Sequence, residues 1–512
     1  MNESPENQNF ETGEEISTIF SNPLEHKQKQ TKNQNKKRIK IIIASVLAVA
    51  VLFGGTFAVI KLIPKKEDPT EPTLEEITVL NIETDDVKSV TVENENGSFK
   101  FNSSQEKNGD NTVTVWLMDG YTSDLTNSYA IESLITSATD VSAIREIDSK
   151  TLKECGLDSP EINVNINANE KITLSVGKKS PDNSGVYVKT SKDDKIYLVA
   201  DALDEILNIT ALDMANTDDI SPLDISEKYS EYYEGETLSS FDDLTIFGEN
   251  LSQKVVVEMN SDKMFASYVP YVVTSPINRI ADNVDDLFDM FIEGIAISSA
   301  YSLDVLPKTI KSLGLDSPDF AVTARFGDYK YTYKFKKQSD GNYAVVGNDS
   351  KMVKGVLATD LEFLSFKTSD FYSGMIFLQS IDDISNLTIK NNGKTHSFDI
   401  KSSDDEQEED YLVNYNDNKI DSANFQSFYQ LLLLLSCNDF TVDNLNSAPE
   451  ISVVFKYNNN QPSTTIDFIK ANATNYQYSI DGNAMGKISS SQVNKILRNL
   501  DKLISGEEII VN

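Results

Sequence analysis

The chain has 512 residues, of which 39% are hydrophobic and 25% are charged, and its formal net charge is −34. A prior of roughly 150 residues per domain predicts about three domains, and the composition excludes a chain that is disordered throughout. The strong negative charge argues against nucleic-acid binding, because a field of that sign repels phosphate backbones.

Residues 1–38 are predicted to form a disordered cytoplasmic tail. They are rich in Asn, Glu, Gln and Lys and lack apolar periodicity, so little burial can offset the entropy lost on ordering. Charge also changes sign along the chain, because residues 1–66 carry a balance of +4 and the remainder a balance of −38. The two ends of the protein are therefore expected to face different environments.

An uninterrupted apolar run, residues 41–60, predicts a transmembrane helix over 39–63. Twenty residues at about 1.5 Å each span about 30 Å, the thickness of a hydrocarbon core. Seven basic residues precede the run and three follow it closely, which places the N-terminus in the cytoplasm. Gly54-Gly55 offers a face for close approach of a neighbouring helix, and a flexible spot in the anchor explains the pair equally well. The alternative to the anchor is a signal peptide cleaved after Ala48-Val49-Ala50. The anchoring side chains are Ile41, Leu47, Leu52, Phe53, Phe57 and Ile60.

Residues 64–79 read as an extended linker rich in Pro and acidic residues. Beyond the linker the chain resembles itself three times, and the predicted copies are 80–215, 216–373 and 374–512. A pair of aspartates opens each copy, at 85, 242 and 382. The pentapeptide Gly-Leu-Asp-Ser-Pro occurs at 156–160 and again at 314–318, with a degenerate version at 444–449.

Each copy shows the same predicted order of elements: strands, an amphipathic helix, a turn, a meander of short strands and a closing helix. The amphipathic helices are expected around 131–141, 277–291 and 425–435, and the closing helices at 201–207, 358–364 and 490–500. The predicted fold class is therefore α+β, with three tandem divergent repeats of an antiparallel-sheet-plus-helix module, preceded by one transmembrane helix.

The repeated pentapeptide is expected to be a structural turn. Glycine can adopt positive φ after a helix, Asp and Ser can accept hydrogen bonds from free amides, and Pro prevents the helix from continuing. A ligand-binding loop is the alternative interpretation. The residues concerned are Gly156, Asp158, Pro160, Gly314, Asp316 and Pro318.

No motif predicts catalysis, a cofactor or a metal site, so we do not expect an enzyme. Of the two histidines, His26 lies in the tail and only His396 lies outside it, so a triad or a histidine metal site would depend on His396. Cys155 and Cys437 lie in different copies and are expected to be buried side chains rather than a disulfide. The acidic stretch 404–410 lacks the spacing and Gly of an EF-hand, which favours a solvated loop over a calcium site.

Together these features resemble a family of bacterial envelope proteins defined by the domain of unknown function DUF4340. The resemblance rests on the anchor, the Asp85-Asp86-Val87 opening, the helix, the repeated turn and the strand pair 186–188 and 196–198. It implies an accessory protein of an ABC-2-type exporter of the gliding-motility class, beside an ATPase, a permease and an auxiliary subunit.

We therefore expect a single-pass protein of the cell membrane with a cytoplasmic N-terminus and an extracellular, non-catalytic scaffold. Its expected partners are the membrane and the permease or auxiliary subunit of the exporter. One alternative is a cell-envelope glycan-binding module, with Trp116 and strand tyrosines as a surface on which polysaccharide stacks. The other alternative is an envelope hydrolase.

Overall fold

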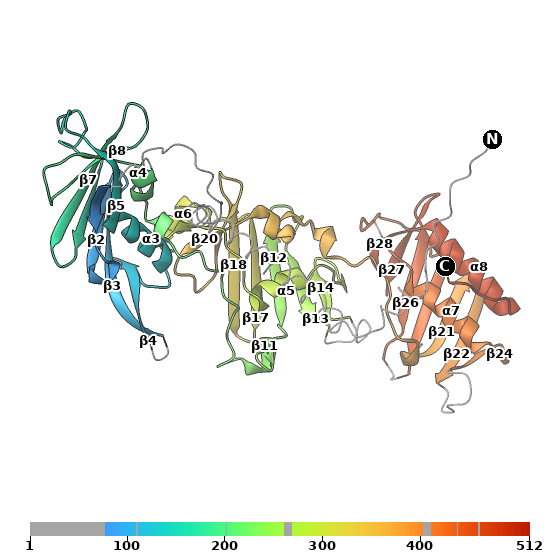
Figure 1. Ribbon diagram of the computed structural model, residues 1–512. Coiled ribbons are helices and arrows are strands. Elements are labelled where there is room, and N and C mark those ends of the chain that lie inside the picture. The colour runs from blue at the N-terminus through green and yellow to red at the C-terminus, as the bar shows by residue number, and fades with distance from the viewer. Residues whose placement is uncertain are drawn as a thin grey trace, which may run out of the picture. The chain divides into compact units, whose positions relative to one another are not determined.

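The computed structural model describes residues 77–511, apart from 109–110, 201, 261–268, 403–410, 438 and 459–460. These residues belong to one compact unit, Glu76–Asn512. They form four antiparallel sheets of nine, two, nine and eight strands (Figure 1). Each of the three large sheets is built from one continuous stretch of chain.

The first large sheet has the strand order β1-β5-β9-β8-β7-β6-β2-β3-β4. Helix α3 (Ser128–Thr139) buries its apolar side against this sheet, and the short helix α4 (Ala202–Leu207) follows the last strand. The strands are β1 (Ile77–Asn81), β2 (Ser89–Asn94), β3 (Gly97–Asn108), β4 (Asn111–Met118), β5 (Asp140–Glu146), β6 (Ile162–Asn167), β7 (Lys171–Lys179), β8 (Val186–Thr190) and β9 (Tyr197–Val199).

The second large sheet has the order β15-β14-β13-β12-β17-β18-β19-β20-β16, and the hairpin β10 (Tyr233–Glu234) and β11 (Thr237–Leu238) precedes it. Its helices are α5 (Asp285–Ile292) and α6 (Pro307–Ser312). The strands are β12 (Asp243–Gly248), β13 (Val255–Met259), β14 (Tyr271–Ser275), β15 (Arg279–Ile280), β16 (Ser299–Ser302), β17 (Phe320–Phe326), β18 (Tyr329–Lys337), β19 (Tyr343–Val346) and β20 (Val353–Val356).

The third large sheet has the order β24-β23-β22-β21-β25-β26-β27-β28. Helices α7 (Ser422–Leu433) and α8 (Ser490–Ser505) lie beside each other over the sheet (Figure 1), and both contribute apolar side chains to its core. The strands are β21 (Ile384–Asn391), β22 (Lys394–Ser402), β23 (Tyr411–Tyr415), β24 (Asn418–Ile420), β25 (Ile451–Tyr457), β26 (Thr464–Lys470), β27 (Asn475–Ile480) and β28 (Asn483–Ser489).

The three large sheets share one strand arrangement. In each sheet the first meander runs outward from β2, β12 or β21, and a second meander begins at the neighbouring strand β6, β17 or β25. Alternating burial along these strands, such as the pattern of β17, sends every second side chain into the core of its sheet. The residues between the two meanders supply α3, α5 and α7 to the three cores, and α8, which follows β28, also packs into the third core.

The predicted α+β class is wrong, because the described residues are mainly antiparallel β-structure with few helices. The helix expected around 277–291 begins only at Asp285, since residues 279–280 pair with β14 as a strand. The closing helix expected at 358–364 is two short 3-10 helices, Ala358–Asp360 and Glu362–Ser365. Short apolar runs do not distinguish a helix from a strand, and sheet pairing decided these cases.

No helix in the described ranges is long and apolar enough to cross a membrane. The predicted helix over 39–63 and its anchoring residues lie outside the described residues. The fold class given above therefore refers only to the described part of the chain. The predicted tail and most of the linker also lie outside, as does the acidic stretch 404–410 with its calcium alternative.

Candidate functional site

The repeated turn lies between a short helical turn and the second meander in the first two large sheets. Gly156 and Gly314 have φ of +72° and +74°, a conformation that favours glycine. The residues that follow them, Leu157 and Leu315, are buried, whereas Asp158, Asp316 and the serines beside them are exposed. Half-buried Pro160 and Pro318 then lead into β6 and β17. These conformations and burials are those of a turn that reverses the chain after a helical turn.

A buried arginine is the most unusual polar group among the described residues. Arg279 begins β15, and only 3% of it is exposed. The central carbon of its guanidinium lies 5.0 Å from the Tyr372 centroid and 4.7 Å from the Phe440 centroid, and the two rings contact each other with centroids 5.2 Å apart. Nη1 donates a hydrogen bond to the Tyr478 hydroxyl at 3.2 Å. The arginine therefore joins the second large sheet to residues of the third.

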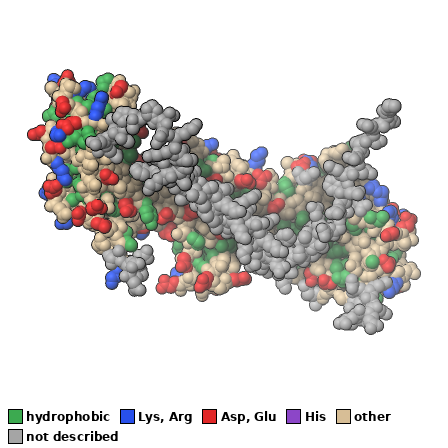
Figure 2. All heavy atoms as spheres, in the orientation of Figure 1, with side chains coloured by type: hydrophobic (Ala, Val, Ile, Leu, Met, Phe, Trp, Pro, Cys, Tyr) green, Lys and Arg blue, Asp and Glu red, His purple; other side chains and the backbone are tan. Residues whose placement is uncertain are grey.

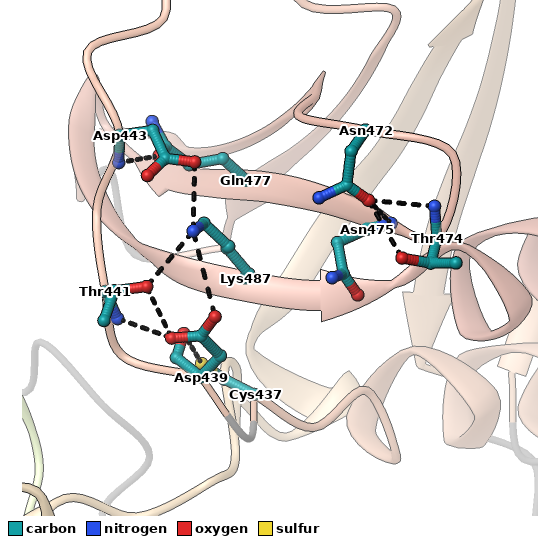
Figure 3. Close-up of polar contacts among 9 residues, drawn as sticks. All are labelled: Cys437, Asp439, Thr441, Asp443, Asn472, Thr474, Asn475, Gln477 and Lys487. Carbon is teal, nitrogen blue, oxygen red and sulfur yellow. Dashed lines mark hydrogen bonds and ion pairs between the residues drawn. The ribbon is translucent and has the colours of Figure 1, made fainter.

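The segment 437–443, of which residue 438 is not described, holds Phe440 in this position. Its backbone lies along the edge strand β28, where the Lys487 amide donates to the Asp439 carbonyl at 2.7 Å. The Lys487 ammonium lies 3.0 Å from an Asp443 carboxylate oxygen and 3.1 Å from the Thr441 hydroxyl (Figure 3). Because both chain neighbours of Phe440 are bonded, its ring has little freedom to leave Arg279.

Two further contacts fix the same segment from β27. The buried Gln477 side chain accepts a hydrogen bond from the Asp443 amide at 2.7 Å. The turn before β27 is closed by Asn472, whose side-chain oxygen accepts from the Thr474 and Asn475 amides at 2.9 Å (Figure 3). The strand that presents Gln477 is thus anchored at its start.

Close approach of the segment to β28 requires a glycine at 486. A Cβ at this position would lie 2.7 Å from the Asp439 carbonyl oxygen and 2.9 Å from the Cys437 sulfur. The residue has φ of +154°, which side chains rarely adopt. Cys437 itself is buried and unpaired, as is Cys155, in agreement with the sequence-based expectation.

Electrostatics strengthen the contacts of the segment. The hydrogen bond from Lys487 to Asp443 raises the pKa of the lysine, and hydrogen bonds from Thr441 lower the pKa of the Asp439 carboxyl. Burial raises the pKa of the Tyr478 hydroxyl well above its usual range. Both shifts favour the charged forms of Lys487 and Asp439 at neutral pH.

The Lys487 contacts predict a defined pH range. A lysine whose pKa is higher in the folded state stabilises the fold below its unfolded pKa, and this stabilisation is lost as the pH rises through the folded pKa. An aspartate whose pKa is lower in the folded state stabilises the fold above its unfolded pKa, and this stabilisation is lost as the pH falls through the folded pKa. The difference in melting temperature between the wild type and Lys487→Met should therefore be constant from about pH 5 to about pH 9 and shrink outside it.

Lys394→Met provides the control for this measurement, because Lys394 is exposed on the same sheet. We expect that variant to follow the wild type at every pH. If Lys487→Met and the wild type have the same melting temperature at pH 7, the lysine contributes nothing to the stability of the fold.

Other residues considered from the sequence serve the fold. Trp116, the centre of the glycan alternative, is 2% exposed in the first core and offers no exposed ring. Asp242 pairs with Arg325 of β17 at 2.7 Å, and Asp382 accepts from the Tyr411 hydroxyl at 2.6 Å. The described residues contain no group of three His, Cys, Asp or Glu side chains that could hold a metal ion.

Sequence reasoning missed Arg279, Gly486 and the segment 437–443. A partial signal existed, because an arginine between Ile277 and Ile280 breaks an apolar pattern that otherwise indicates burial. The partners of the arginine lie about 90 to 200 residues further along the chain. Nothing in a single sequence indicates such a distant pairing.

One comparison with known proteins gave a match, and the match covers the part of the chain that contains Arg279. A family model, Domain of unknown function (DUF4340), matches residues 116–226 and 274–452, which together make up more than half of the chain. The matched ranges include Arg279 and the segment 437–443, whereas Gly486 lies beyond them. Neither the curated proteins nor the solved structures gave a match. The protein described here is therefore a member of the DUF4340 family.

Proposed function

We propose that this protein is a membrane-anchored, extracellular, non-catalytic scaffold that serves as an accessory subunit of an ABC-2-type export system. The observation that carries the proposal is the asymmetry of the chain. An apolar segment, residues 41–60, has basic residues before it and a strongly acidic remainder after it. The family resemblance supplies the expected partners, which are the permease and the auxiliary subunit.

Packing between the sheets supports a scaffold. Arg279 joins the second large sheet to the third, and Lys351 of the second sheet pairs with Asp124 of the first at 2.6 Å. These contacts join residues that are far apart in the sequence. Such contacts favour a body that positions partners over one that transforms a substrate.

Surface charge is consistent with a body outside the cell membrane. Acidic side chains are scattered over the visible face rather than gathered in one patch (Figure 2). A balance of −38 beyond residue 66 disfavours contact with anionic lipid headgroups, whereas the basic residues before the apolar segment favour it. The acidic part would therefore contact proteins or exported material rather than the bilayer.

Co-purification tests the proposal. The full chain, tagged at its C-terminus and extracted in mild detergent, should recover an ATPase and a permease at fixed stoichiometry. Because Gly54 and Gly55 allow close helix packing, replacing both with leucine should keep the protein in the membrane fraction and reduce permease recovery at least tenfold.

Thr56→Leu is the control, because it also adds a leucine to the apolar segment but lies on the opposite side of the predicted helix from the glycine pair. It should leave the recovery of the permease unchanged. Recovery of the wild-type chain without any transporter subunit would rule out the accessory role, and equal loss in the control would rule out the glycine face.

A further inference from the structure

The first large sheet ends in a long hairpin whose outer strand has no strand on its other side. Strand β4 is the last strand of that sheet and pairs with β3 alone. Strand β2 pairs with residues 97–102 of β3, whereas β4 pairs with residues 101–108. The far ends of β3 and β4 therefore extend past β2 as a two-stranded ribbon (Figure 1). A ribbon of this kind is only marginally stable by itself.

The outer edge of β4 presents backbone groups to a further strand. The Asp119 amide, directly after the strand, donates to a β3 carbonyl at 2.7 Å. The Trp116 amide points away from β3 and donates to the Ser128 hydroxyl of α3 at 2.9 Å. Because the direction of hydrogen bonding alternates along an antiparallel strand, the amides and carbonyls of Thr112 and Thr114 also point away from β3. No backbone hydrogen bond joins either threonine to another element in the described ranges.

The sequence of β4 lacks the features that usually protect an edge strand. Its residues read Asn-Thr-Val-Thr-Val-Trp-Leu-Met, without charge, proline or glycine. Edge strands normally carry such residues or are covered, because free backbone groups pair with any strand that reaches them. Val113 and Val115 lie on one face of the strand, and Val113 is 38% exposed. The edge of β4 is therefore open to strand pairing.

Charge indicates which strand this edge accepts. The chain beyond residue 66 carries a balance of −38, so two copies repel each other in general, and a foreign partner would be expected to be basic and to meet acidic residues. The hairpin is an exception to this charge, because residues 97–118 contain two basic and two acidic residues, none of them in β4. An uncharged edge on an acidic body matches another copy of itself.

We propose that two copies of this chain pair through β4, with the two strands antiparallel and a two-fold axis at Val113. This register places Thr112 of one copy opposite Thr114 of the other, so both threonines of each strand exchange backbone hydrogen bonds across the axis. An axis at Thr114 would instead place Thr112 opposite Trp116, whose amide is already bonded to Ser128. The first large sheets of the two copies then form one continuous sheet.

Pairing explains why an unprotected edge is tolerated, since each β4 covers the other and closes it to further strands. The pair is independent of the export role proposed above, because it uses only the first large sheet. A chain that lacks an exporter partner would still form it.

Disulfide trapping in the full chain, kept in mild detergent, tests the register. The two copies of residue 113 would face each other as a non-hydrogen-bonded pair with Cα atoms about 4.5 Å apart, which a disulfide can bridge. Val113→Cys should therefore form a disulfide-linked dimer under mild oxidation. The native cysteines, Cys155 and Cys437, are buried and should stay reduced.

Val115→Cys is the matched control, on the same face of the same strand. In the proposed register the two copies of residue 115 lie about 13 Å apart along the strands, too far for a disulfide. This variant should cross-link at least tenfold more slowly than Val113→Cys. Equal rates for the two variants, or no dimer of Val113→Cys, would overturn the proposal.

Thr114→Pro in the Val113→Cys chain tests the backbone pairing. Proline removes an amide that points away from β3, so it deletes a donor to the second copy and leaves the hydrogen bonds of the hairpin in place. Cross-linking should slow at least tenfold. Thr114→Val keeps the amide and loses only the hydroxyl, which accepts from Gln105, so it should leave the rate unchanged. An unchanged rate in the proline variant would show that the copies do not meet along this edge.

Sedimentation velocity of the unmodified chain gives a readout that needs no added cysteine. The wild type should approach the mass of two chains as its concentration rises. Val113→Lys places like charges opposite each other at the axis, so it should need at least tenfold higher concentration to pair. A wild type that remains a single chain would refute the pairing, and a species of three or more chains would replace the two-fold axis with a head-to-tail contact.

Discussion

Gly486→Ala is expected to release the segment 437–443 from β28 and to lower the free energy of local opening by about 3 kcal/mol. The added methyl would lie 2.7 Å from the Asp439 carbonyl oxygen, and backbone rather than a flexible side chain is in the way. Overpacking of this kind costs about 1 to 3 kcal/mol, and the positive φ adds about 1 kcal/mol for a residue other than glycine.

Hydrogen exchange measures this effect at one site. The Lys487 amide donates to the Asp439 carbonyl, so its protection reports on whether the segment is in place. A loss of about 3 kcal/mol corresponds to a roughly hundredfold fall in protection. Circular dichroism should change little, because the sheet behind the segment stays intact.

Gly482→Ala is the matched control in the same hairpin. Gly482 also has positive φ, +80°, but nothing lies within 4 Å of a Cβ there. It should therefore show only the backbone cost of about 1 kcal/mol. Equal effects of the two substitutions would mean that contact with the segment plays no part in the requirement for glycine.

Arg279→Ala is expected to be less stable than Arg279→Met by about 3 kcal/mol at the contact between the second and third large sheets. Alanine leaves a cavity beside the rings of Tyr372 and Phe440, whereas methionine fills most of the same space. Both substitutions remove the cation–π contacts and the bond to Tyr478, so their difference reports on volume.

The methionine variant measures the net effect of the charge. Two cation–π contacts, each worth up to about 2 kcal/mol when desolvated, and one hydrogen bond favour the arginine. The burial of an unpaired charge opposes it by several kcal/mol. We therefore expect Arg279→Met to lie within about 1 kcal/mol of the wild type in local stability.

Hydrogen exchange of peptides covering 372–380 and 437–443 compares the three proteins. Faster exchange in both peptides for alanine, but not for methionine, is the expected pattern. If methionine opens the contact as much as alanine, the charge of Arg279 rather than its volume stabilises the contact between the sheets.

Local patterns of apolar residues predicted part of the fold. Alternation over 162–166 and 172–176 predicted strands that the structure contains, and the apolar spacing at 425–432 predicted the helix that is α7. These patterns are local, because one buried face repeats every two or every 3.6 residues. They failed at 277–280, where a short apolar run joins β14 rather than the following helix.

By itself, the sequence determined the charge asymmetry, the family resemblance, the repeated turn with its two glycines, and most of the strands, because each depends on neighbours within a few residues. Only the tertiary structure decided that the class is mainly β, and that Arg279 meets Phe440 and Tyr478. That contact depends on where strand pairing places residues up to 199 positions apart, and no local periodicity encodes such a distance.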